Sequence, residues 1–421
     1  PASGGTPEIV LAPDEGKTSG HSNPSFLPDD ERFLFTSEVE ESGNTLPIVQ
    51  VADLADPSRS RTLIKRAMDA RWSNGHLVYG TEDGVLTAQP VDPDSLELIG
   101  TPFEIGRGMR ADSRFGGYVG ADASASGVVV YRTSQYAQAE FWWFSPTGLR
   151  LERASEPGVW HNFDLSPDGQ RIATTVRVPG AGNELWIIET ERGIASRVDE
   201  AEALGASDPT WSPDGRRLAF RHGQNLVTRS AQGGELRTVL NERAYPDSWS
   251  RDGKWLAYGN ASLGRYDLFA IALDEADAKP IRLNEGSSSS DEPKFSPNGN
   301  WVAYATQVDA EVFVVPFPPT GERWQLSSNG GLQPRWSADG DTLFYLEPGG
   351  QLMRVPVRDS DPGNAGAPEL VFDTGLEGSV SYDDYTVAPD GRFLVRLPIQ
   401  GAEANARAPI HVLVGWEEPE R

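Results

Sequence analysis

Polar side chains recur at one position along this chain, a few residues ahead of a repeated Ser-Pro-Asp-Gly phrase. Half of them are carboxylates, and the others are amides, tyrosines, one arginine and one histidine. If the segments that carry them converge, they could hold a cation such as Ca²⁺ through oxygen ligands or bind a basic peptide. The candidate ligand-binding residues are His161, Asn162, Asp208, Tyr245, Asp247, Asp291, Glu292, Gln333, Arg335, Tyr382, Asp383 and Asp384.

The carboxylates of this set also leave an enzyme open as the alternative. Carboxyl groups or a metal ion at the mouth of a channel support lyase, lactonase or glycosidase chemistry. The residues for that chemistry would be Asp247, Asp291, Glu292, Asp383 and Asp384. Other catalytic patterns are missing, because the sequence has no Gly-x-Ser-x-Gly elbow, no cysteine and no His-x-x-x-His pair. We therefore predict no catalytic residue, no metal ligand and no cofactor, with Ca²⁺ as the one candidate ion.

A structural role is predicted for the aspartates inside the repeated phrase. Ser can bond the local backbone, Pro presets φ, Asp tolerates the third position, and Gly accepts the positive φ that closes a tight turn. Each of these aspartates should therefore serve its own turn and take no part in catalysis. The full copies of the phrase begin at Leu165, Trp211, Trp249, Phe295, Trp336 and Val387.

The elements that would position the candidate residues are β-hairpins. An aromatic or apolar residue precedes each turn and a β-branched or aromatic run follows it, as in strands. Two more strand-like runs follow each hairpin, and the unit repeats about every 40 to 50 residues, which is typical of a four-stranded propeller blade. Since strand direction alternates, the candidate residues should share the face opposite the turns, near the central channel.

Three weaker copies precede the six full ones, so we predict a single all-β domain, residues 1–421, with nine four-stranded antiparallel blades; eight is the alternative if the third unit is incomplete. Residues 1–20 would hold a closing strand, Glu8–Leu11, that completes the last blade beside Ile410–Val414. A ring of nine should leave a wide, wet channel. The predicted blades are 21–64, 65–107, 108–155, 156–203, 204–242, 243–285, 286–330, 331–375 and 376–421 plus 8–11.

Composition excludes some partners. The net charge is −25 and the isoelectric point is about 4.6, so the surface should repel phosphate backbones and nucleic acid is not expected as a partner. No apolar run approaches the roughly 18–20 residues that a membrane-spanning helix needs. We expect a monomer that binds a peptide, a protein or a glycan.

The repeat resembles the TolB-like β-propeller of bacterial periplasmic proteins. It is most similar to the propeller that follows the kinase domain in bacterial serine/threonine protein kinases. The segments that carry the resemblance are His21–Asp29, Leu86–Asp92, Leu96–Pro102, Val314–Pro318, Trp324–Ser327, Gln333–Trp336 and Pro409–Glu418.

That resemblance implies a sensor or interaction domain in a periplasmic or extracellular location, although a cytoplasmic one stays open. The chain itself has no kinase motif, neither His-Arg-Asp nor Asp-Phe-Gly. The leading hypothesis is thus a non-catalytic binding propeller, the second is a propeller enzyme, and the third is a purely architectural subunit.

Overall fold

The computed structural model describes residues 9–12, 18–41, 44–81, 84–107, 109, 120–132, 138–178, 182–198, 205–262, 265–275, 278–284, 289–358, 361–376, 383–399 and 410–416. Within these ranges the protein is all-β, with two short 3₁₀ turns, η1 (Pro57–Arg59) and η4 (Pro362–Asn364). No helix in them has the length and apolar character to cross a bilayer. The chain divides into two compact units: unit 1 comprises residues 1–136 and 405–421, and unit 2 comprises residues 137–404.

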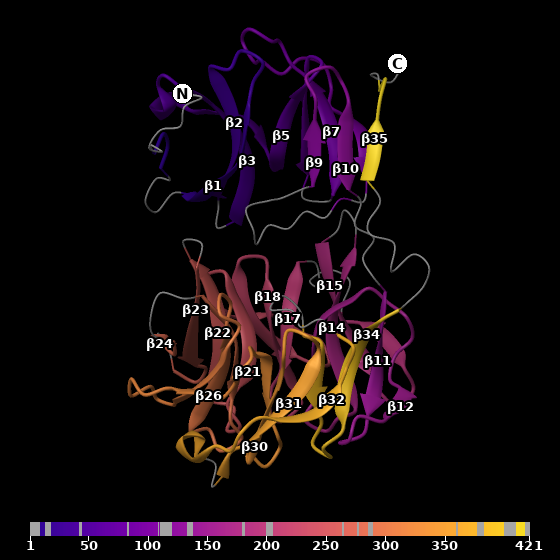
Figure 1. The fold of residues 1–421 in the computed structure, drawn as a ribbon, viewed down its shortest axis with the longest axis vertical. Helices are drawn as coiled ribbons and strands as arrows, with labels where there is room; N and C mark the ends of the chain where they lie inside the picture. Colours follow the sequence, from indigo (N-terminus) through magenta and orange to yellow (C-terminus); the bar gives the residue numbers. More distant parts are fainter. Residues whose placement is uncertain are drawn as a thin grey trace. The chain divides into compact units, whose positions relative to one another are not determined.

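Unit 2 contains six four-stranded antiparallel sheets in its described residues, and five of them are built from consecutive strands (Figure 1). The first two of these sheets are β13 (Trp160–Leu165), β14 (Arg171–Val178), β15 (Gly182–Glu189) and β16 (Ile194–Arg197), and then β17 (Ala206–Trp211), β18 (Arg217–His222), β19 (Asn225–Ser230) and β20 (Arg237–Leu240). The third and fourth are β21 (Ala244–Trp249), β22 (Trp255–Ser262), β23 (Arg265–Ala272) and β24 (Ile281–Arg282), and then β25 (Ser290–Phe295), β26 (Trp301–Thr306), β27 (Val312–Pro316) and β28 (Trp324–Gln325). The fifth is β29 (Leu332–Trp336), β30 (Thr342–Leu346), β31 (Gln351–Pro356) and β32 (Glu369–Asp373).

The sixth sheet of unit 2 joins strands from the two ends of the unit. Its order is β12-β11-β34-β33, where β11 (Ala139–Phe144) and β12 (Arg150–Arg153) come first in the sequence. The strands β33 (Tyr385–Val387) and β34 (Phe393–Pro398) come last. Strands β11 and β34 pair in register from Ala139 opposite Pro398 to Phe144 opposite Phe393.

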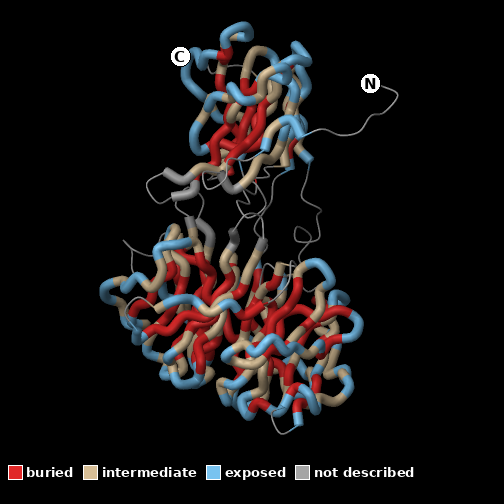
Figure 2. The backbone as a smooth tube through the Cα atoms, turned by 90° about the vertical axis from the view of Figure 1, so that its left-hand side faces the viewer, coloured by how far each residue is buried: buried red, intermediate tan, exposed pale blue. Residues whose placement is uncertain are grey.

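Six hydrophobic cores lie between these six sheets, one at each interface (Figure 2 shows the buried backbone in red). Five of the cores join sheets that follow one another in the sequence. The sixth joins Leu394 of β34 and Phe141 of β11 to Phe163 of β13 and Ile172 of β14. Six sheets with six interfaces close on themselves, so unit 2 is a six-bladed β-propeller whose innermost strands are β13, β17, β21, β25, β29 and β33.

Unit 1 contains three sheets in its described residues. The first is β1 (Thr18–Phe26), β2 (Arg32–Glu41), β3 (Asn44–Asp53) and β4 (Arg61–Lys65), and the second is β5 (Ala67–Ser73), β6 (His76–Thr81), β7 (Val85–Pro90) and β8 (Phe103–Arg107). The third has three strands in the order β35-β10-β9, formed by β9 (Ala121–Ala123), β10 (Val129–Arg132) and β35 (Ile410–Leu413). Two cores join the three sheets.

The all-β propeller architecture and the count of nine sheets agree with the sequence-based prediction, but their grouping and closure do not. Strand β35 pairs with β10, and the described residues 9–12 form no strand, with Ile9 89% exposed; Glu8 of the predicted closing strand lies outside the described residues. The strands of the predicted blades 108–155 and 376–421 are therefore combined differently: β35 from the second joins β9 and β10 from the first. The outer strands β11 and β12 complete the hairpin β33–β34, because the apolar side chains Phe141 and Trp143 fit the core beside β13.

The turn aspartates bond within their own turns, as the sequence predicts. In the copy at Ser212, the hydroxyl donates to Asp214 Oδ1 (2.6 Å) and accepts from the amide of Arg217 (2.9 Å), while Gly215 N donates to Ser212 O (2.9 Å). The same three bonds recur at Ser250, Ser296 and Ser337. The Ser212 hydroxyl, with a contribution from the backbone amide of Arg216, lowers the pKa of Asp214.

Replacing the turn serine therefore has a measurable cost. Ser212→Ala removes two hydrogen bonds from a buried side chain, and we expect unit 2 to lose about 1–2 kcal/mol of unfolding free energy. Urea unfolding followed by tryptophan fluorescence measures the loss. The control is Ser196→Ala, an exposed serine on the outer strand β16, which should change stability by less than about 0.5 kcal/mol. Equal effects of the two substitutions would contradict the structural role of the turn.

Candidate functional site

The candidate residues sit at β-bulges near the start of the innermost strands of unit 2. In each of five strands the register slips by one residue at this point, so that the inner strand has one residue more than its partner. Three of the bulges hold a residue with positive φ just before a proline: Asp208 (54°), Glu292 (56°) and Gln333 (55°). Such backbone is costly for Glu and Gln and occurs most often where a side chain must be aimed.

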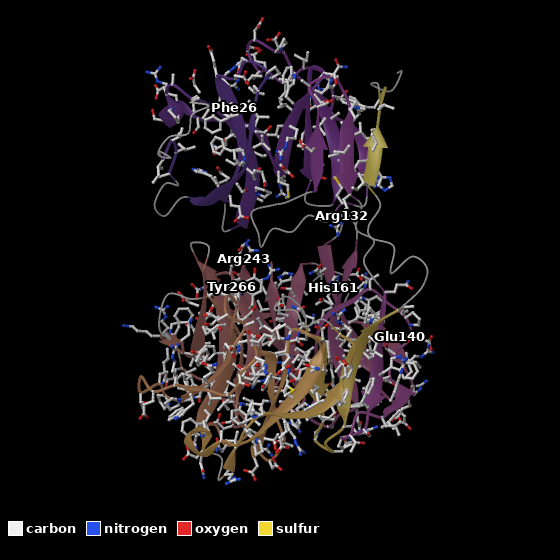
Figure 3. All side chains as sticks on the ribbon, in the orientation of Figure 1. Phe26, Arg132, Glu140, His161, Arg243 and Tyr266 are labelled. Atoms are coloured by element: carbon white, nitrogen blue, oxygen red, sulfur yellow. The ribbon has the colours of Figure 1, made fainter. Side chains whose placement is uncertain are left out.

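All these bulges lie at one end of the ring. Figure 3 labels His161, Arg243 and Tyr266, which lie together at the end of unit 2 where the inner strands begin. The Ser-Pro-Asp-Gly turns lie at the other end, because each follows the end of an inner strand. We call the bulge end the rim.

Charges on opposite sheets act on one another across the rim. The charge of Asp383, which precedes β33, raises the pKa of Asp247 on β21, three sheets away around the ring. Similarly, burial raises the pKa of Asp164 on β13, and the charge of Lys294 on the opposite strand β25 opposes this shift. Six inner strands, not the nine of the predicted ring, therefore surround the axis of unit 2 in the described residues.

Arg335 on β29 is the centre of the most buried part of the rim. Its guanidinium donates to the carboxylate of Asp383 and lies 3.7 Å from Glu292 Oε2 on β25. Burial alone would lower the pKa of Arg335, but the carboxylates of Asp383 and Glu292 more than offset it and raise the pKa. Burial also raises the pKa of Glu292 well above its ordinary value, although Arg335 opposes the shift.

Lys294 and Asp247 form the next contact around the ring. The ammonium of Lys294 donates to the backbone carbonyl of Asp247 (2.7 Å) and lies 3.9 Å from its Oδ1. Burial raises the pKa of Asp247, and the neighbouring carboxylates of Asp291 and Asp208 raise it further. Asp291 accepts a hydrogen bond from Gln307 (3.4 Å).

Asn162, Asp208 and Asp164 continue the rim on β13 and β17. The amide of Asn162 donates to Asp208, and Asp164 accepts from the Thr210 hydroxyl (3.1 Å) and the Trp211 amide (2.7 Å). These bonds cross from one sheet to the next, so they hold the rim together.

Other candidates turn out to join sheets rather than form the rim surface. Gln333 is fully buried, and its amide exchanges two hydrogen bonds with Asp384, to the carboxylate (3.0 Å) and from the backbone amide (2.8 Å). Arg396 pairs with the same carboxylate at 2.6 Å. Tyr245 packs under Arg221 and accepts from Arg243 (2.7 Å). Tyr382 lies outside the described residues.

The structure thus brings eight of the twelve candidates together at the rim: His161, Asn162, Asp208, Asp247, Asp291, Glu292, Arg335 and Asp383. Sequence reasoning missed Asp164 and Lys294. Both stand two residues before the turn serine of their blade, at the position that Arg335 occupies in its own blade, and this spacing could have identified them.

A metal site finds no support in the described residues, where no group of three or more His, Asp or Glu side chains is placed to hold an ion. The rim instead interleaves its carboxylates with Lys294 and Arg335.

Comparison with known proteins finds a family model that matches part of the repeat. Residues 146–317, all within unit 2, match the model of the TolB beta propeller domain. The solved structure of a putative TolB from Agrobacterium tumefaciens superposes with a TM-score of 0.52 at 18% identity, over 63% of this chain and 99% of that one. The predicted resemblance to TolB-like propellers is therefore confirmed in fold.

Curated relatives are also similar to parts of this chain. An uncharacterized protein of Agrobacterium fabrum is 26% identical over 62% of this chain and 85% of its own length. The uncharacterized peptidase YuxL of Bacillus subtilis is 29% identical over 34% of this chain, and dipeptidyl-peptidase 5 of Aspergillus fumigatus is 28% identical over 31% of it. The match spans about a fifth of the length of these two peptidases.

Proposed function

We propose that this protein is a non-catalytic binding propeller and that its ligand, a protein or a peptide, docks at the rim of unit 2. The observation that carries the proposal is the convergence of charged side chains from opposite sheets at one end of a closed ring. A ring of convergent polar groups over a channel is a common form of binding site. The resemblance to propellers attached to kinases supports a sensor in the periplasm or outside the cell.

The rim chemistry favours binding over turnover. Asp383 is engaged by Arg335, and Asp384 by Arg396, so neither is placed as a general acid or base beside an open position. Asp247 and Glu292 keep raised pKa values, which is the one observation that favours the enzyme as a second candidate. The peptidase relatives do not decide between these functions, because the match covers only a small part of them.

A capture experiment with internal controls tests the proposal. The full chain is immobilised, partners from an extract of the source organism are identified by mass spectrometry, and a glycan array is run beside it. The rim variant is Asp291→Asn. The control is Glu191→Gln, an exposed residue between β15 and β16 at the turn end of the ring.

We expect a partner that the wild type and Glu191→Gln capture and that Asp291→Asn loses by about tenfold or more. Capture that is equal in all three proteins would refute the rim as the site. Lyase, lactonase or glycosidase turnover that disappears in Asp291→Asn would replace the binding function with the enzyme.

A further inference from the structure

The rim carries more negative than positive charge in its described residues. Of the residues described above as meeting at the rim, six carry carboxyl groups and two carry basic groups. The carboxyl groups belong to Asp164, Asp208, Asp247, Asp291, Glu292 and Asp383, and the basic groups to Lys294 and Arg335. Like charges held this close are unfavourable, so a cation bound at the rim would lower the free energy of these carboxylates.

Two atoms of the rim show what kind of cation fits. Glu292 is only 6% exposed, yet its Oε2 accepts no hydrogen bond and its nearest basic atom is Arg335 Nη1 at 3.7 Å. Asn162 Oδ1 is also buried and accepts no hydrogen bond. Both atoms are acceptors, and a buried acceptor without a donor costs about 1–3 kcal/mol. A ligand that matches these two atoms would therefore supply hydrogen-bond donors.

The backbone supports the same reading. Glu292 is held at a φ of 56° in the bulge of β25, a conformation that glutamate adopts at a cost. Its pKa responds to Arg335, Asp383, Asp291 and Lys294, residues that come from three sheets. The Glu292 carboxylate thus lies among charged groups contributed by β25, β29 and the segment before β33.

We propose that the rim of unit 2 binds an alkylammonium or guanidinium group carried by a lysine or arginine side chain of a basic peptide segment. An ammonium or guanidinium carries several N–H donors and a positive charge, so it can donate to an orphan acceptor and offset the excess of carboxylates together. A peptide is the source favoured by the rim, because five inner strands contribute side chains that a small amine could not reach at once. This inference rests on the proposed binding function.

Direct titration tests the ligand chemistry. The probe is a fluorescein-labelled Gly-Lys-Gly-Lys-Gly peptide, added to the full chain at about 150 mM salt so that long-range attraction to the acidic surface is screened. The comparison probe is the same peptide with both lysines acetylated, which removes the charge and most donors. Putrescine serves as a competitor that offers the ammonium without a peptide.

We expect acetylation and Glu292→Gln each to weaken binding by about tenfold or more, as for a lost charge-assisted hydrogen bond. Glu191→Gln removes one charge from the turn end and should change the affinity by less than about twofold. If Glu292→Gln does not fold, as judged by circular dichroism, Asp291→Asn takes its place with the same expectation.

Several results would overturn the inference. Equal binding of the acetylated peptide excludes the cation, equal losses in Glu292→Gln and Glu191→Gln reveal attraction to net charge alone, and competition by putrescine at the affinity of the peptide excludes the peptide as the source. The proposed function fails separately. If the capture experiment finds a partner at the rim that does not contain a basic segment, the binding function stands and only the ligand chemistry is wrong.

Discussion

Replacing Arg335 with methionine is expected to destabilise unit 2 by about 3–5 kcal/mol at neutral pH. Methionine fills much of the same volume, but it leaves the carboxylates of Glu292 and Asp383 without the guanidinium that faces both. Both acids are largely buried, so their charge is poorly compensated by water. Urea unfolding monitored by tryptophan fluorescence measures the loss.

The loss should depend on pH in a defined direction. An acid whose pKa is raised by folding binds more protons in the folded state, so its contribution to stability falls as pH rises from its unfolded value, about 4.3 for Glu, through its folded value. Burial already raises the pKa of Glu292, and removal of Arg335 extends this window toward neutral pH. The variant should therefore recover part of its stability between pH 7.5 and pH 5.5.

The matched control is Arg354→Met, which breaks an ion pair with Glu369 on strands β31 and β32. Both partners are about half exposed, so the expected loss is about 0–1 kcal/mol at either pH. Equal losses for Arg335→Met and Arg354→Met, or a loss in Arg335→Met that is the same at both pH values, would show that the rim charges are well solvated.

The second large effect concerns the closure of the ring. Leu394 of β34 is fully buried in the core that joins the composite sheet to β13 and β14. We expect Leu394→Ala to cost unit 2 about 2–5 kcal/mol, from lost burial and the cavity left behind. Leu149→Ala makes the same chemical change at a site 67% exposed, just before β12, and should cost less than about 0.5 kcal/mol. A small effect at Leu394 would place the closing contacts elsewhere.

The repeated elements of this fold could be predicted because their signals are local. The phrase at Ser212 specifies a turn through its own side chains, and the apolar alternation of Trp211 and Leu218 specifies the strands beside it. Nine sheets follow from counting these signals. The place of Glu292 at the rim also follows from its position relative to the turn, whereas its positive φ does not.

Closure could not be predicted in the same way, because it depends on which distant strands pair. Ile410–Leu413 and Phe141–Phe144 both have the alternation of a third strand, and nothing local says which one follows the hairpin at Phe393. The structure selects Phe141–Phe144, whose Phe141 and Trp143 fill the core beside β13. One signal was available in the sequence: small residues dominate Gly401–Ala408, a composition typical of a linker.

The pairing of strands at the border of the two units has a consequence for how such a chain can evolve. The last residue of β10, Arg132, lies opposite Ile410, so the chain leaves unit 1 and re-enters it at neighbouring positions. Ala139 lies opposite Pro398, so the chain also enters and leaves unit 2 at neighbouring positions. Adjacent ends let a domain be inserted into a host or excised from it without breaking either hydrophobic core. Unit 2 therefore has the organisation of an inserted domain, and a host gene could acquire it through a single insertion between two strands.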